Sequence, residues 1–168
     1  YIAFMDGVVM GGGMGISQGA SLRIVTERSK VAMPETNIGL FPDVGGGYFL
    51  SRCPGASGEY LALTGQLMVG GEAIALGLAD KLVNSADMPA LWDILSNQPS
   101  LSVSDRLDRL EDLLGGSQAI PEPAWLNGQI DAIFSLETIS EIVTALDNDG
   151  SAWANQTLDV LYRRSPLM

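Results

Sequence analysis

The chain opens with an unbroken apolar run, and the pattern behind it predicts a strand, a turn and a helix. Residues 1–5 read Tyr-Ile-Ala-Phe-Met, and this length and composition suit a strand buried on both faces. Asp6 and Gly7 form a turn pair that ends the run. Glycines fill residues 11–13, and residues 14–20 then read as the first turns of a helix. We therefore expect a buried strand that leads through a glycine hinge into a helix.

Shorter polar and apolar patterns continue this alternation of strands and helices to about residue 85. Residues 21–25 alternate as a half-buried strand does, and residues 31–33 form a further short extended piece before a proline. Helices are predicted over residues 58–64 and 72–78, and a short edge strand over residues 79–83.

Beyond residue 89 the pattern is almost wholly helical. Two amphipathic helices are each preceded by a capping box, in which a hydroxyl and an acid three residues later bond each other's backbone. The boxes pair Ser102 with Asp105 and Thr138 with Glu141. The apolar stripe of the first helix is Leu107, Leu110 and Leu114, and that of the second lies within residues 139–146. Residues 147–150 read as a turn. We predict an α/β fold class in one domain, with residues 1–85 as its core and residues 86–168 as its helical C-terminal part.

Composition narrows the classes of function. The 168 residues are 46% hydrophobic, which favours one packed domain, and no apolar run approaches the length of a membrane span. A formal net charge of −11 argues against nucleic acid and anionic membranes as partners. Histidine is absent, so acid–base chemistry depends mainly on carboxylates. Cys53 is the one cysteine, which excludes an internal disulfide and suits a reducing compartment. Because Tyr1 starts inside an apolar run, we expect a fragment of a longer chain.

The glycine hinge is the first candidate site. A strand, a glycine turn and a helix start leave backbone N–H groups that point outward and suit an anion, or an oxygen that becomes one during a reaction. Gly11, Gly12 and Gly15 are therefore candidates for binding the substrate and forming half of an oxyanion hole. The alternative, that the glycines only allow a helix to pack closely on a strand, stays open. Phosphate-loop patterns are excluded because neither the lysine nor the G-x-G-x-x-G spacing occurs.

Glu35 and Asp43 are the candidate catalytic carboxylates. Each is flanked by a proline and by apolar side chains, and Gly39 permits a chain reversal between them. Surroundings of this kind withdraw water from a carboxyl group, as general acid or base catalysis near neutrality requires. The ordinary alternative is an exposed Glu35 and an Asp43 that only caps a helix over residues 44–52. The apolar neighbours are Met33, Ile38, Leu40, Phe41 and Val44.

A rival motif overlaps the glycine hinge. Residues 15–19 fit G-x-S-x-G, the nucleophile elbow of the α/β-hydrolases, with Ser17 as nucleophile. Two observations weigh against it. Ser17 would lie inside the predicted helix rather than on a sharp turn, and the chain has no histidine to accept its proton.

Two runs, residues 11–17 and residues 33–50, resemble the crotonase (enoyl-coenzyme A hydratase/isomerase) superfamily. Within it, the sequence is most similar to the 3-hydroxyisobutyryl-coenzyme A hydrolase branch. The resemblance implies a crotonase-like spiral of ββα units followed by C-terminal helices. It also implies a thioester oxygen held by two backbone N–H groups, of which one maps to Gly12 and the other belongs to an upstream segment. Coenzyme A is then part of the substrate, and no separate cofactor or metal is expected.

The resemblance also separates hydrolysis from hydration. Hydratases carry one glutamate at the position of Gly15 and a second at the position of Glu35, whereas the hydrolase pattern has glycine at the first and adds an aspartate matching Asp43. We therefore expect an acyl-coenzyme A thioester hydrolase of valine catabolism, in the cytoplasm of a bacterium or the mitochondrial matrix of a eukaryote. A hydratase or isomerase of the same fold is the first alternative. A catalytically silent assembly domain is the second, and homo-oligomers stay open; exposure of the Leu107 stripe would favour assembly.

Overall fold

The computed structural model describes residues 1–96, 102–114, 120 and 123–164, and its strands form two small sheets. One sheet has the order β1-β3-β6 and is parallel throughout; the other has the order β2-β4-β5, with β5 antiparallel to β4. The strands are β1 (Ile2–Met5), β2 (Val8–Met10), β3 (Leu22–Thr26), β4 (Lys30–Ala32), β5 (Met68–Val69) and β6 (Lys81–Val83). Each successive turn of chain adds one strand to each sheet, as a spiral of ββα units does.

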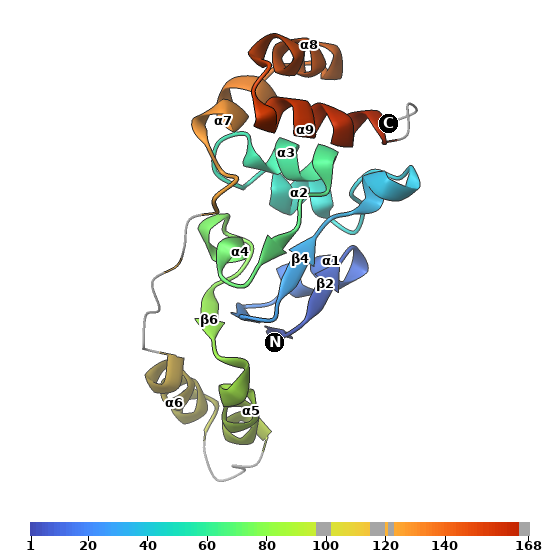
Figure 1. Ribbon diagram of the computed structural model, residues 1–168. Helices are drawn as coiled ribbons and strands as arrows, with labels where there is room; N and C mark the ends of the chain where they lie inside the picture. The colour runs from blue at the N-terminus through green and yellow to red at the C-terminus, as the bar shows by residue number, and fades with distance from the viewer. Residues whose placement is uncertain (97–101, 115–119, 121–122, 165–168) are drawn as a thin grey trace.

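Helices follow the strand pairs in the first half of the chain, and after β6 the described residues form helices and no further strand. Those of the first half are α1 (Gly12–Gln18), the 3-10 helix η1 (Glu35–Ile38), α2 (Gly46–Leu50), α3 (Ser57–Thr64) and α4 (Glu72–Ala75). Those of the second half are η2 (Ser85–Asp87), α5 (Met88–Ser96), α6 (Val103–Leu114), α7 (Gly128–Phe134), α8 (Ile139–Asp149) and α9 (Ala152–Tyr162). Figure 1 shows α5 and α6 at one end of the molecule and α7, α8 and α9 at the other, where α9 lies beside α3.

Among the described residues, three clusters of buried apolar side chains hold these parts together. The central one lies between the two sheets and α1 to α4. A second joins α3 to α7, α8 and α9 around Tyr60 and Phe134. The third packs Leu110 and Leu114 of α6 against Ile24 of the β1-β3-β6 sheet. Burial of Leu110 and Leu114 removes them as evidence for an assembly surface; the side chain of Leu107 lies outside the described residues.

Several local predictions are confirmed and others are wrong. Both capping boxes form, because their hydrogen bonds are local to each helix start. Strand β1 is half-buried rather than buried on both faces, since it lies at the edge of its sheet. The short β2 strand was not predicted, and residues 147–149 are the last turn of α8, which ends at Gly150 with φ 61°. No helix within the described ranges is long and apolar enough to cross a bilayer.

An ion pair between Arg23 and Asp80 holds the residue that directly precedes β6. Arg23 on β3 makes a two-pronged contact with Asp80, at 3.0 Å from Nε and 2.6 Å from the terminal nitrogen. Its backbone N–H donates to the same carboxylate at 2.7 Å. The Arg23 hydrogen bonds hold the pKa of Asp80 below its usual value.

Replacing Asp80 by asparagine is therefore expected to lower the free energy of unfolding by about 1–2 kcal/mol at pH 7. Because the folded-state pKa is lowered, this stabilisation is fully present above the unfolded pKa of about 4, and it is lost as pH falls from there through the lower pKa of the folded state. Urea unfolding at pH 7 and pH 3 measures both values. Asp159→Asn, an equal charge change at an exposed position of α9, is the control. A deficit of the same size at both pH values would contradict the electrostatic origin.

Candidate active site

Glu35 is buried directly beneath the glycine hinge. Only 7% of its surface is exposed. A Cβ at Gly11 would lie 2.7 Å from Glu35 Oε1, so the carboxylate fits there only because residue 11 has no side chain. Gly11 also has φ 51°, a left-handed conformation that glycine adopts without strain. The structure thus brings Glu35 and the glycine hinge together.

The chain places Glu35 by a short and tightly closed segment. Strand β4 leads through buried Met33 to Pro34, which precedes the single turn of η1. The backbone carbonyl of Glu35 accepts a hydrogen bond from Leu40 N–H at 3.1 Å, across a reversal made by Gly39 with φ 76°. The Glu35 side chain is therefore fixed at the end of a buried strand, where its position depends on packing rather than on a flexible loop.

One oxygen of this carboxylate is left unpaired by the residues that the structure describes. Glu35 Oε2 is buried and has no hydrogen-bond partner among the described residues. Burial of a carboxylate oxygen without a partner is costly, so such groups are rare in proteins and are found at sites where a substrate or a water completes the bonding. Glu35 Oε2 can therefore accept a hydrogen bond from a substrate or a water.

The backbone beside Glu35 offers donors to such a ligand. Helix α1 begins at Gly12, and no side chain caps its first turn. Gly11 N–H donates to Ala32 O and Gly15 N–H to Gly11 O, whereas no partner for Gly12 N–H is found in the described part of the chain. The Cβ position of Gly12 faces open space, with no atom within 4 Å. Gly12 therefore presents a free amide in an uncrowded place, which suits a developing oxyanion.

Gly15 is held by the loop that carries Asp43. A Cβ at Gly15 would lie 2.6 Å from Val44 Cβ and 2.7 Å from the Val44 carbonyl oxygen. Val44 has φ 44°, a left-handed backbone that is uncommon for a β-branched residue. The space that a side chain at position 15 would need is thus filled by Val44.

Asp43 has neither the apolar surroundings that were predicted for it nor the helix-capping role of the ordinary alternative. It is exposed, and so are most of the neighbours that were expected to keep water away from it, including Leu40 at 50% and Phe41 at 71%. It also does not cap a helix: α2 starts later, its N-cap is Gly45 with φ 88°, and the Asp43 carbonyl accepts from Gly46 N–H. Asp43 adjoins Val44 and so lies on the loop that packs on α1, but in contact with solvent.

Two other reactive side chains prove to be structural. Ser17 lies inside α1, and its hydroxyl donates to the Gly13 carbonyl at 2.7 Å, which does not fit a nucleophile elbow. Burial raises the pKa of the Cys53 thiol to about 11, with a smaller contribution from Glu59. A thiol with that pKa carries almost no thiolate at neutral pH and is a poor nucleophile.

Comparison with known sequences gives consistent matches over the whole chain. The family described as Enoyl-CoA hydratase/isomerase matches residues 1–168. A zebrafish (Danio rerio) protein named "3-hydroxyisobutyryl-CoA hydrolase, mitochondrial" is 42% identical over 170 residues, covering 99% of this chain and 44% of that protein. The Neurospora crassa "Small ribosomal subunit protein mS47" is 39% identical over 184 residues, covering 99% of this chain and 36% of that protein. The chain thus spans less than half the length of these relatives.

Solved structures agree with the sequence matches. A carnitinyl-CoA dehydratase from Mycobacterium thermoresistibile superposes with a TM-score of 0.84 at 34% sequence identity, over 99% of this chain and 47% of that one. The predicted α/β fold, a spiral of ββα units followed by helices, is confirmed by this match.

Proposed function

Because the chain belongs to the enoyl-CoA hydratase/isomerase family, we propose that it is an acyl-coenzyme A thioester hydrolase of the 3-hydroxyisobutyryl-coenzyme A type. The observation that carries the proposal is the buried Glu35 carboxylate against Gly11, whose Oε2 has no hydrogen-bond partner in the part of the chain that the structure describes. That carboxylate and the free Gly12 amide supply a nucleophile or base and an oxyanion donor at one place.

In the proposed reaction, the thioester carbonyl oxygen accepts a hydrogen bond from Gly12 N–H. This bond strengthens as the oxygen gains negative charge, and one donor of this kind contributes about 3 kcal/mol to transition-state stabilisation. Glu35 then either attacks the carbonyl carbon, forming an anhydride that water cleaves, or removes a proton from the attacking water. Either route releases the carboxylic acid and the thiol of coenzyme A. Asp43, exposed on its loop, positions the 3-hydroxyl group and exchanges a proton with the leaving thiolate.

The contact between Gly15 and Val44 supports hydrolysis over hydration. Addition of water to a double bond in this family uses a second carboxylate at position 15, and here residue 15 is glycine with its side-chain space filled by Val44. Thioester cleavage needs one nucleophile or base at the carbonyl carbon, and Glu35 supplies it in this proposal.

A direct assay tests the proposal. The purified protein is incubated with 3-hydroxyisobutyryl-coenzyme A and, separately, with crotonyl-coenzyme A. We expect release of free thiol from the first and no loss of the enoyl absorbance of the second. Loss of that absorbance without thiol release would assign the protein to the hydratases. For an active protein, label found in Glu35 after one turnover in oxygen-18 water would establish the anhydride route, because general-base catalysis puts the label only in the released acid.

An assembly role is the second candidate, favoured by the relative named as a ribosomal subunit protein at nearly the same identity. It predicts no turnover of either thioester and stable association with a large particle. The thiol-release assay therefore discriminates between the two functions.

A further inference from the structure

The segment that joins η1 to α2 borders the candidate site, because both of its ends are attached there. At one end, Leu40 N–H donates to the backbone carbonyl of Glu35 at 3.1 Å. At the other end, Val44 fills the space beside Gly15, whose N–H donates to the Gly11 carbonyl at 3.0 Å. Since Gly11 also lies against the Glu35 carboxylate, these contacts close a ring, and the three residues between the two ends form one side of it.

These three residues do not all face the same way. Pro42 turns inward, since its Cβ lies 2.8 Å from the position that a Cβ on buried Gly46 would take. Phe41 and Asp43 flank this proline and are both exposed, Phe41 to 71%. The border of the site therefore presents an aromatic ring and a carboxylate that are two residues apart.

The exposure of Phe41 is not explained by packing within the described part of the chain. A ring that stays in water contributes little to the stability of the fold. Ile38 and Leu40, on the same segment, are also exposed, to 75% and 50%. Exposed apolar side chains that gather beside a site are typical of a surface that binds a ligand. An apolar group held at this border would cover the ring and leave water itself.

We infer that Phe41 determines specificity for the acyl group by packing on the methyl branch of 3-hydroxyisobutyryl-coenzyme A. The inference rests on the proposed function, in which Asp43 positions the 3-hydroxyl group. In this acyl group the methyl branch sits on the carbon next to the one that bears the hydroxyl, so the two groups lie side by side, as Phe41 and Asp43 do. Phe41 thus recognises the branch, and Asp43 recognises the hydroxyl.

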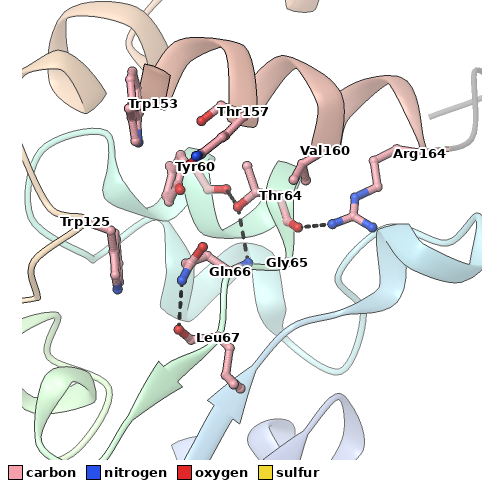
Figure 2. A pocket seen from close by; sticks show the side chains of 11 residues that line it. Tyr60, Thr64, Gly65, Gln66, Leu67, Trp125, Trp153, Thr157, Val160 and Arg164 are labelled. Atoms are coloured by element: carbon pink, nitrogen blue, oxygen red, sulfur yellow. Dashed lines mark hydrogen bonds between the residues drawn. The ribbon is translucent and has the colours of Figure 1, made fainter. Parts of the chain in front are cut away.

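A separate cleft of about 390 Å³ is the alternative place for an apolar group. Figure 2 shows it beside α9, with Val160 on that helix. None of residues 11–15 or 35–44 lines this cleft, so a group bound in it does not lie between Phe41 and Asp43. Shortening Val160 is therefore the control for shortening Phe41.

Binding of two analogues measures the contribution of Phe41 without any turnover. In both analogues a methylene group replaces the thioester sulfur; the acyl group is 3-hydroxyisobutyryl in one and 3-hydroxypropionyl, which lacks the methyl branch, in the other. Isothermal titration calorimetry gives the ratio of their dissociation constants. We expect Phe41→Ala to lower the preference for the branched analogue about fourfold, as loss of one buried methyl contact does, and Phe41→Leu to keep most of it. Val160→Ala should leave the preference unchanged.

Thiol release from 3-hydroxyisobutyryl-coenzyme A is measured on the same proteins. An unchanged preference in Phe41→Ala, an equal loss in Val160→Ala, or no binding of either analogue would overturn the inference. A change of oligomeric state in Phe41→Ala, seen by analytical ultracentrifugation, would also overturn it, because the ring would then belong to an interface between copies of the chain. Binding with the expected loss of preference but without thiol release would overturn the proposed hydrolase and support the role of Phe41.

Discussion

Replacing Glu35 by glutamine is expected to lower kcat for thioester hydrolysis about 10³-fold or more, with little change in KM. The amide has nearly the shape of the carboxylate and fits in the same place beneath Gly11. It can neither attack the thioester carbonyl nor take a proton from water, so the loss falls on the chemical step. Release of free thiol from 3-hydroxyisobutyryl-coenzyme A measures it.

Glu59→Gln is the matched control for this substitution. Glu59 is exposed in the first turn of α3, so the same chemical change there should leave kcat within about twofold. The proposed role of Glu35 would be wrong if Glu35→Gln kept more than about a tenth of the original kcat.

Glu35→Gln should also raise the thermal stability of the protein. A buried carboxylate oxygen without a partner destabilises the folded state, and a neutral amide at the same place is less costly to bury. We expect a gain of about 1 kcal/mol, seen as a higher Tm. Loss of activity together with a gain of stability would distinguish a functional group from a structural one.

Elements with local signals could be predicted from the sequence. The two capping boxes each lie within four consecutive residues, and the polar–apolar alternation around β3 is long enough to show its period. Strand β2 has three residues between a turn and the glycine hinge, too few to show a period. Residues 147–149 were assigned to a turn because they are polar, although Gly150, an αL helix end, fits a helix that reaches it.

The site could be predicted only in part, because some of its contacts leave no local signal in the sequence. The burial of Glu35 follows from its own segment, which joins a buried strand to a tight reversal at Gly39. Asp43 lies in an equally apolar segment, yet nothing in that segment reveals whether its apolar side chains point inward, and most are exposed. The contact of Val44 with Gly15 joins residues distant in sequence. Such contacts depend on the packing of whole elements, which a pattern along the chain does not specify.

The contact between Gly15 and Val44 makes catalysis sensitive to any side chain added at position 15. Replacing Gly15 by alanine should lower kcat about 10²-fold while leaving α1 intact. Gly15 lies within a helix, where alanine is the better residue by about 1 kcal/mol, so the backbone does not oppose the change. The added Cβ would meet the side chain and the carbonyl of Val44 at 2.6–2.7 Å, and the loop bearing Asp43 must move away. Because a shift of about 1 Å in a positioning group is enough for such a loss, thiol release should fall although circular dichroism is unchanged.

Gly13→Ala separates this steric effect from helix propensity. It makes the same change in the same helix, but its Cβ would meet Val9 at 3.7 Å, an ordinary contact, so activity should persist and stability should rise slightly. Val44→Gly removes two of the three close contacts at position 15, while the one to the carbonyl oxygen remains. The double variant should therefore recover part of the activity that Gly15→Ala loses. Equal losses in Gly13→Ala and Gly15→Ala, or losses that simply add when Gly15→Ala and Val44→Gly are combined, would show that this contact does not position the Asp43 loop.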